Sequence, residues 1–310
     1  MSGYFVRRAL RTLLVLIVAS TAVFYGLRFA PGDPTGGVLS PTALEEVREA
    51  YRERLGLNQP IWVQYGVYLG NLLRGDLGTS IVTGKSMGEL LGFYGRNSLM
   101  LGLAATFLIY AIGLPLGAIA AARRNGIIDQ AITGISVAGM GIPNFWLALL
   151  LIFLFASKLH WLPSGGCCSP QQLILPAVVL AAEGTAVTIR MTRSSMLEQL
   201  GQDFVRTHRA KGLSETAVVY IRVFRNALIP VISLAGLRLG WLVGYSLIVE
   251  TIFQWPGVGY LLVDATLRRD YPVAQFFSLL LVTVVVVANL LADVAYGMAD
   301  PRIRAAPGSL

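Results

Sequence analysis

The chain has 310 residues, of which 55% are hydrophobic and 14% are charged, and its formal net charge is +8. A water-soluble domain could not bury this much apolar surface, so the composition indicates a membrane protein with several spans. The positive charge does not indicate a nucleic-acid partner, because the basic residues stand at the ends of apolar stretches rather than along one face.

Six apolar stretches reach or approach the length of about twenty residues that a membrane-spanning helix needs. The fourth is the weakest, because Glu183 lies within it and Arg190 lies near its end. The sequence therefore predicts an all-α polytopic membrane protein. We place its six spans at residues 10–29, 98–121, 131–157, 173–191, 233–253 and 274–295.

The distribution of basic residues predicts the orientation of these spans, because Lys and Arg are concentrated in cytoplasmic loops. With the N-terminus inside, the two short outer loops carry only Lys158, Arg268 and Arg269, and the inner segments carry many more. We therefore expect a multi-pass protein of the cell membrane, surrounded by lipid, with both termini in the cytoplasm. The first span is expected to be retained, since no small-x-small cleavage site precedes Pro31.

The segment after the first span, residues 31–95, is expected to lie outside the cell. Within it, the alternating Glu and Arg residues of 42–55 predict a solvated helix, and residues 65–73 predict a second, amphipathic helix. The stretch from Gly78 to Ser86 looks at first like a phosphate-binding loop. Its glycines are separated by five residues where that loop needs four, it has no βα context, and it lies outside, so we expect no nucleotide there.

The sequence contains no set of residues that would support catalysis or a metal site. The only histidines, His160 and His208, belong to no His-Glu-x-x-His helix and to no Ser-His-Asp arrangement. Cys167 and Cys168 are adjacent, and neighbouring cysteines rarely bridge each other, so we expect no structural disulfide. Imidazole and thiolate suit transition metals, but we regard the proximity of these cysteines to His160 as a coincidence of the loop.

Residues 199–230, between the fourth and fifth spans, combine many basic residues with helix signals. We expect a first helix over 199–211 that stops at Gly212, a second helix over 214–226, and Pro230 before the next span. A basic loop that only touches lipid headgroups is one alternative. A helix–turn–helix that projects from the membrane is the other, and we favour it because a rigid projection can transmit a push.

Charged residues within spans are costly and usually face a cavity or a partner. Glu183 is the deepest and is our acidic candidate for a translocation pathway. Glu250 lies near the outer end of the fifth span, where it either closes an outer gate or fixes the following turn. Arg190 and Asp293 lie near cytoplasmic ends of their spans, where snorkelling or an ion pair at the helix end is sufficient.

The fifth span has two different faces. Small residues recur every four positions on one face, which lets another helix approach closely, and large residues cluster on a second face at about 100° per residue. The large residues either fill a core or line the passage, and we expect them to line it. The first face comprises Gly236, Gly240 and Gly244, and the second comprises Arg238, Trp241 and Tyr245.

Motifs along nearly the whole chain resemble the permeases of ABC importers, in the dipeptide, oligopeptide and nickel branch. The 199–230 segment is similar to the cytoplasmic "EAA" loop of that family, in the version that reads Arg-Thr-Ala-Arg-Ala-Lys-Gly-Leu, and only His208 departs from it. Further matching stretches are 55–60, 74–80, 142–148, 161–163, 249–259, 269–273 and 299–304.

The resemblance implies a type I ABC-importer permease fold with six membrane-spanning helices and a helical extracytoplasmic segment. It divides the chain into 1–30, the N-terminal tail and first span; 31–95, the outer segment; and 96–310, the five-helix core that contains the 199–230 loop. It implies that this loop couples to an ATPase through Arg206, Thr207, Arg209, Ala210, Lys211, Gly212, Leu213 and Pro230.

The resemblance also implies the partners: a homologous second permease subunit, two cytoplasmic ATPase subunits and an extracytoplasmic solute-binding protein. ATP and Mg would be used by the ATPases, and this chain would bind no cofactor. Peptides are the substrates that the family favours, and nickel or a metal chelate is the alternative. A self-contained carrier or channel is less favoured, because the sequence shows no inverted repeats or paired broken helices.

Overall fold

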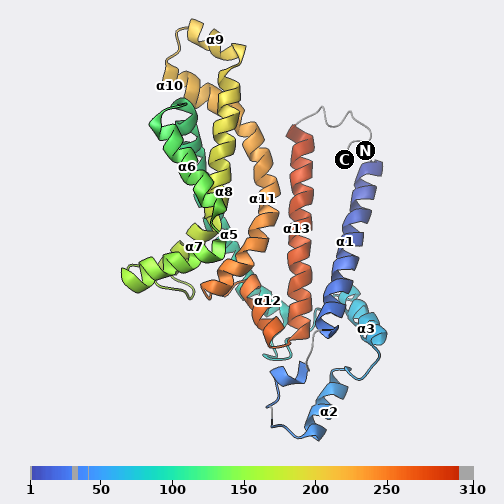
Figure 1. Cartoon of the computed structure of the whole chain (residues 1–310). Helices are drawn as coiled ribbons and strands as arrows, with labels where there is room; N and C mark the ends of the chain where they lie inside the picture. Colours follow the sequence, from blue (N-terminus) through green and yellow to red (C-terminus); the bar gives the residue numbers. More distant parts are fainter. Residues whose placement is uncertain (1, 30–33, 41, 300–310) are drawn as a thin grey trace. The chain divides into compact units, whose positions relative to one another are not determined.

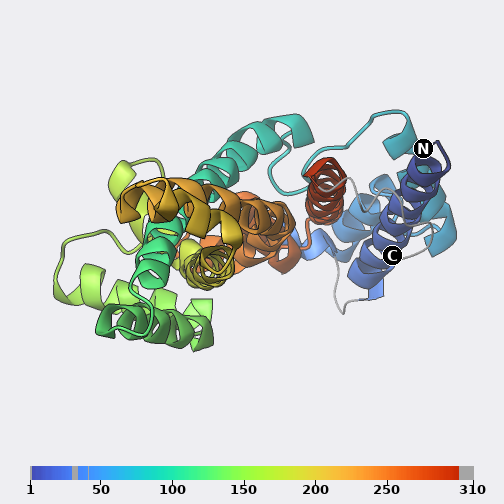
Figure 2. The ribbon, with the colours of Figure 1, turned by 90° about the horizontal axis from the view of Figure 1, so that it is seen from above.

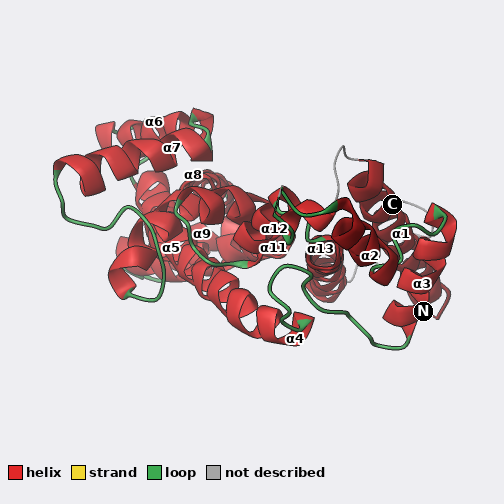
Figure 3. Ribbon diagram, turned by 90° about the horizontal axis from the view of Figure 1, so that it is seen from below, coloured by secondary structure: helices red, strands yellow, loops and turns green. Residues whose placement is uncertain are grey.

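The computed structural model describes the backbone of residues 2–29, 34–40 and 42–299, and the side chains of these residues except at 2–9, 34, 233–239, 241 and 291–299. Throughout this part of the chain the regular elements are helices, and an isolated bridge joins Thr79 to Ser86. The predicted all-α class is confirmed (Figure 1). Figures 2 and 3 show the same helices from above and from below.

Contacts divide the chain into two compact units, which comprise residues 1–98 with 256–286 and residues 99–255 with 287–310. The predicted division at residues 30 and 95 stays a prediction. The first unit contains α1 (Ser2–Phe29), η1 (Pro34–Gly37), α2 (Glu45–Arg54), α3 (Ile61–Leu73), α4 (Met87–Leu90), the π-helical η2 (Leu91–Gly95), α12 (Val258–Leu267) and the first part of α13 (Tyr271–Ala299).

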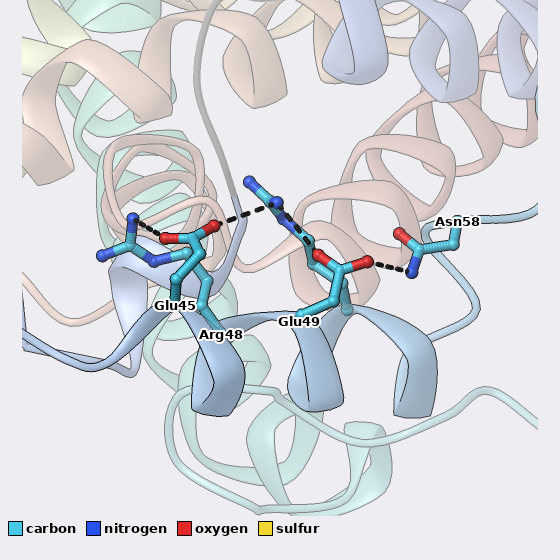
Figure 4. A network of polar contacts seen from close by, with 5 residues as sticks. Glu45, Arg48, Glu49 and Asn58 are labelled. Atoms are coloured by element: carbon cyan, nitrogen blue, oxygen red, sulfur yellow. Dashed lines mark hydrogen bonds and ion pairs between the residues drawn. The ribbon is translucent and has the colours of Figure 1, made fainter.

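Both helices expected in residues 42–73 are present. The surface of α2 carries ion pairs from Arg48 to Glu45 at 3.4 Å and from Arg52 to Glu49 at 3.3 Å, and Asn58 donates to Glu49 at 2.8 Å (Figure 4). The α3 helix begins directly after Pro60, four residues earlier than expected. The described part of residues 42–73 therefore contains the two helices that the sequence predicts.

The stretch that resembles a phosphate-binding loop binds an anion that belongs to the chain itself. Asp270, buried between α12 and α13, accepts hydrogen bonds from the Ser80 hydroxyl and from the backbone N–H groups of Ile81 (3.1 Å) and Val82 (3.4 Å). The Ser80 Oγ accepts a further bond from the N–H of Thr83 at 2.8 Å. This loop therefore attaches residues 80–83 to the turn that precedes α13.

The second unit is organised around the long helix α8 (Pro170–Leu200), which begins with a capping box at Ser169. Its other elements are α5 (Arg96–Ala122), α6 (Ile127–Gly141), α7 (Asn144–Leu151), the π-helical η3 (Ile152–Lys158), α9 (Asp203–Ala210), α10 (Glu215–Ala217), the π-helical η4 (Val218–Val223) and α11 (Phe224–Ile252). A core of residues from α5, α8 and the end of α11 includes Leu101, Ile109, Val179, Leu180, Phe253 and Trp255.

Four described helices are long and apolar enough to span a membrane. The predicted third span, residues 131–157, falls on a bent pair of helices: α6 meets the helix of α7 and η3 at an angle of 104°, and the two together are apolar enough to count as a fifth span. The bend falls at Ile142–Pro143, where proline lacks the N–H that a continuous helix needs and restricts the residue before it. The predicted fifth span lies within α11, where the side chains of 233–239 and 241 are outside the described residues.

The expectation of no disulfide is also wrong, because the structure joins Cys167 to Cys168. The backbone accommodates this adjacent pair by turning at Cys168, which has a positive φ of 82°. The disulfide lies in the turn between η3 and α8, and the neighbouring Gly166 donates its N–H to the Phe253 carbonyl at 2.9 Å.

Two glycines of α5 allow the close approach of α8. A Cβ at Gly117 would lie 2.6 Å from the Thr192 Cβ and 2.8 Å from the Ile189 carbonyl oxygen, and a Cβ at Gly113 would lie 2.8 Å from the Thr188 Cβ. Backbone and branched side chains cannot yield at such distances without a shift of the helices. The α5–α8 contact therefore requires glycine at these positions.

We predict that Gly117→Ala destabilises the protein by about 1–3 kcal/mol, because the added methyl group overpacks this contact. The matched control is Gly102→Ala in the same helix, where a Cβ would meet no described atom within 4 Å. Alanine favours helix more than glycine does, so the control should be neutral or stabilising. Thermal unfolding of the purified protein in detergent measures both changes, and equal melting temperatures for the two variants would contradict the packing account.

Candidate functional site

The 199–230 segment forms a helical corner at one end of the second unit. The α8 helix continues to Leu200, α9 follows over Asp203–Ala210, and α10 leads through η4 into α11. Figure 1 shows α9 and α10 at the end of α8 that lies away from α7. Two expected bounds are wrong. The first helix starts at Asp203 instead of Gln199, because Gly201 and Gln202 form a turn between α8 and α9. The second helix does not end at Asn226 but continues through Pro230 as part of α11.

Gly212 ends α9 in a conformation that favours glycine. Its φ is 75°, in the left-handed region. The Leu213 N–H donates to the His208 carbonyl at 3.3 Å and the Gly212 N–H donates to the Arg209 carbonyl at 3.0 Å. These two bonds are the Schellman pattern, which satisfies carbonyls at a helix C-terminus. The predicted stop at Gly212 is therefore present, with a definite geometry.

An ion pair spans the turn after Gly212. The Arg209 Nε donates to one Glu215 carboxylate oxygen at 3.0 Å and the Nη2 donates to the other at 2.5 Å. The hydrogen bonds from Arg209 hold the pKa of Glu215 below its ordinary value. The pair therefore persists above the unfolded-state pKa of this carboxyl and is lost as the pH falls through the lowered value. The Ser214 hydroxyl caps α10 by accepting the Ala217 N–H at 3.4 Å.

One side of α9 is packed against the ends of other helices. Val205 is fully buried in a cluster with Ala118 and Ala121 of α5 and Met196 of α8. The same cluster contains Val218, Val219, Val223 and Ala227 from η4 and α11. The His208 ring is half-buried and lies edge-on to Phe204, with 6.0 Å between the ring centroids. The α9 helix is thus attached to α5, α8 and the start of α11.

The other side of the corner is exposed and mainly basic. Arg206 and Asp203 have side chains that are 82% and 96% exposed, with 3.8 Å between their charged atoms. The structure brings most of the predicted coupling residues onto this surface, and Pro230 lies apart from it inside α11. The exposed members of the predicted set are Arg206, Thr207, Arg209, Ala210, Lys211, Gly212 and Leu213.

An ion pair near the same end of the unit was not identified from the sequence. Asp129, buried at the start of α6, accepts two hydrogen bonds from Arg193 of α8, at 2.5 Å and 2.8 Å. The N–H of Asn125 donates to the same carboxylate at 2.9 Å. The pair fastens α6 to α8. The two residues are 64 positions apart, so the sequence does not show that they pair. The one local sign was an Asp among apolar residues at the start of a helix.

The predicted pathway residues are distributed over α8 and α11. Glu183 is half-buried in α8, Glu250 is fully buried beside Val249 near the end of α11, and Tyr245 packs against the core of the unit. Of the two interpretations of Glu250, an outer gate or a residue that fixes the following turn, its full burial favours the second. The side chains of Gly236, Arg238 and Trp241 lie outside the described residues.

The glycine face of α11 is described at two positions. Gly240 is buried, whereas Gly244 is exposed, and a Cβ at Gly244 would meet no described atom within 4 Å.

The two charged residues expected near the cytoplasmic ends of their spans are Arg190 and Asp293. Arg190 is exposed on α8 and donates to the Met140 sulfur at 3.5 Å, and the side chain of Asp293 lies outside the described residues. Among the side chains that the structure describes, no group of three or more His, Cys, Asp or Glu residues could hold a metal ion.

Comparison with known proteins identifies the family. Residues 113–305 match the family described as "Binding-protein-dependent transport system inner membrane component", and residues 1–92 match the N-terminal part of such components. The chain belongs to this family. It is a permease subunit of an ABC importer and a multi-pass membrane protein, as the resemblance implied.

Curated relatives match over almost the full chain. The oligopeptide transport system permease protein AppB of Bacillus subtilis is 42% identical over 98% of this chain and 100% of its own length. The glutathione transport system permease protein GsiC of Escherichia coli strain K12 is 40% identical over 98% of this chain and 99% of its own length. A probable peptide ABC transporter permease protein of Sinorhizobium fredii, y4tP, is 37% identical, with 98% and 100% covered.

A solved structure shows the same fold. An inward-facing structure of the MetNI methionine ABC transporter matches with a TM-score of 0.58 and 22% identity, over 69% of this chain and 98% of that chain. The predicted type I permease fold is therefore confirmed.

We predict that the Arg209–Glu215 pair orders the corner after α9. The single variants Arg209→Glu and Glu215→Arg place like charges together and should speed hydrogen exchange of residues 208–217, and the double exchange of charges should restore it. Hydrogen exchange read by mass spectrometry measures this effect. If the double variant exchanges as fast as either single variant, the pair does not brace the turn.

Proposed function

We propose that this permease couples ATP hydrolysis in partner subunits to solute passage through the corner formed by α9, Gly212 and α10. The observation that carries the proposal is the division of α9 into two sides. One side is buried through Val205 against α5, α8 and α11, and the other side is exposed and basic. A force applied to the exposed side is therefore carried by packed side chains to three helices of the unit.

The partners follow from the family and from the incomplete pathway of one subunit. A second, homologous permease completes the passage, two cytoplasmic ATPases use ATP and Mg, and an extracytoplasmic binding protein delivers the solute. This arrangement places the α9 corner and both termini in the cytoplasm and the 31–95 segment outside. The basic residues around Arg206 support the inside placement of the corner.

The substrate class that we propose is short peptides, including small thiol peptides of the glutathione type. The relatives support this class, because their names specify oligopeptides, glutathione and peptides. Nickel is not favoured by these names.

The pathway residues stay predictions. They are Glu183 and the face of α11 formed by Arg238, Trp241 and Tyr245. Measuring peptide uptake by an Arg238→Gln variant tests whether this face lines the passage.

The coupling proposal is tested by Gly212→Val in the assembled transporter. Valine at a φ of 75° is strained, since the left-handed region costs an L-residue about 1–2 kcal/mol, so the α9–α10 corner should be displaced. We expect the variant to insert and assemble, to lose at least about tenfold in peptide uptake into vesicles, and to leave ATP hydrolysis no longer stimulated by the binding protein and peptide.

The matched control is Gly201→Ala in the same segment. Gly201 has an ordinary φ of −79°, and its Cβ would have only a normal contact of 3.5 Å. The control should transport normally, and Gly212→Asn should retain more uptake than Gly212→Val, because asparagine tolerates the left-handed region. Wild-type uptake by Gly212→Val would remove the coupling assignment.

A further inference from the structure

The first unit contains a cavity of about 290 Å³, which is lined by none of the residues assigned above to coupling or to the pathway. Its walls come from α1, α3, the turn at 76–78 and the start of α13. This volume is near the lower limit of small-molecule sites. Apolar side chains form most of the wall, including Leu55, Val63, Val67, Leu72, Phe276 and Leu279.

A cation lies in this apolar wall. Arg28 donates from Nε to the Gln64 side-chain oxygen at 2.8 Å and from Nη1 to the Phe24 carbonyl at 3.4 Å, and its guanidinium carbon lies 3.5 Å from the centroid of the Phe24 ring. Among the residues whose side chains are described, no carboxylate forms an ion pair with it. A guanidinium has five N–H donors, so Arg28 retains donors for an anion.

A second donor of the same wall has no acceptor among the described residues. Gln275 is 5% exposed, and its amide nitrogen is buried without a hydrogen-bond acceptor in the described part of the chain. Leaving a buried donor unsatisfied is costly, and native structures rarely do so. An acceptor supplied by a molecule in the cavity would remove this cost.

The cavity also contains a carboxylate. Asp76 accepts a hydrogen bond from the Gly78 N–H at 3.0 Å, and it forms no ion pair with Arg28 in the structure described. The wall therefore offers a cation and an anion that do not neutralise each other. A ligand that carries both a negative and a positive group matches this arrangement better than a simple anion does.

The helix beside the cavity has the composition of a helix that lies at a membrane surface. The α3 helix, which forms one wall, has large apolar side chains at its surface, with Trp62 73% exposed, Val67 57% exposed and Leu73 88% exposed. Arg28 lies in the last turn of α1, at the end of a span. Tryptophan and apolar helix faces are typical of the membrane–water interface.

We propose that this cavity binds the headgroup of a zwitterionic phospholipid. The phosphate accepts hydrogen bonds from Arg28 and from the Gln275 amide, the ammonium group lies toward Asp76, and the acyl chains lie along the apolar surface of α3. The inference is independent of the solute that the transporter carries.

The test measures lipid retained by the full-length chain, purified with its partner subunits from membranes that contain phosphatidylethanolamine and phosphatidylglycerol. Native mass spectrometry counts the bound lipids after delipidation. We expect retained phosphatidylethanolamine, reduced about tenfold by Arg28→Gln and about threefold by Gln275→Leu, in line with the loss of a charge-assisted and a neutral hydrogen bond. Arg74→Gln is the matched control and should retain the lipid, because Arg74 is exposed and lies outside the cavity.

Gln275→Leu is expected to fold normally, because it replaces an unsatisfied amide by an apolar group of similar size. A loss of lipid in this variant therefore cannot be attributed to misfolding. Unchanged retention in both Arg28→Gln and Gln275→Leu would overturn the proposal. Equal retention of phosphatidylglycerol would overturn the assignment of the ammonium group. Displacement of the lipid by millimolar inorganic phosphate would show a site for a free anion and overturn the assignment to a lipid.

Discussion

The burial of Val205 is the contact on which the mechanical account of this permease depends. A buried valine contributes roughly 1.5–3 kcal/mol, and here the neighbours come from α5, α8, η4 and α11. Without this cluster, α9 would be attached only through its flanking residues, and a push on its exposed surface would bend the chain at Gly201 and Gly212. With it, the proposed coupling surface is packed against α5, α8 and the start of α11.

Two further contacts hold α8 against its neighbours. Gly113 and Gly117 bring the backbones of α5 and α8 together, and the Asp129–Arg193 pair fastens α6 to α8. Each contact joins α8 to a different neighbour. The α8 helix therefore relates the exposed corner to the helices around it, and it also carries Glu183, the candidate pathway residue.

The sequence was sufficient for features that depend on local chemistry. Apolar length predicted most of the spanning helices, and Gly212 predicted a stop because a left-handed residue ends a helix in a recognisable way. Gly113 and Gly117 have the same four-residue spacing as the glycines of the fifth span, but their importance depends on Thr188 and Thr192 of a distant helix. A sequence gives no sign of which of two similar glycine patterns meets a close neighbour.

Other features depend on contacts far apart in the chain. The Gly78–Ser86 loop reads as an anion-binding segment, and it does surround an anion, but that anion is Asp270, about 190 residues away. The sequence shows the proline at position 143, but the angle of 104° between the two helices depends on how they pack. The Cys167–Cys168 bridge required a positive φ at Cys168, which no local pattern specified.

The most direct test of the coupling account is site-specific cross-linking in the assembled transporter. With Cys167 and Cys168 replaced by serine, a cysteine at exposed Arg206 should cross-link to an ATPase subunit, and a cysteine at Trp161, which is 68% exposed in the turn between η3 and α8, should not. A cross-link that forms at position 206 and changes in yield with bound nucleotide is the predicted result. No cross-link from position 206, or one from position 161, would contradict the account.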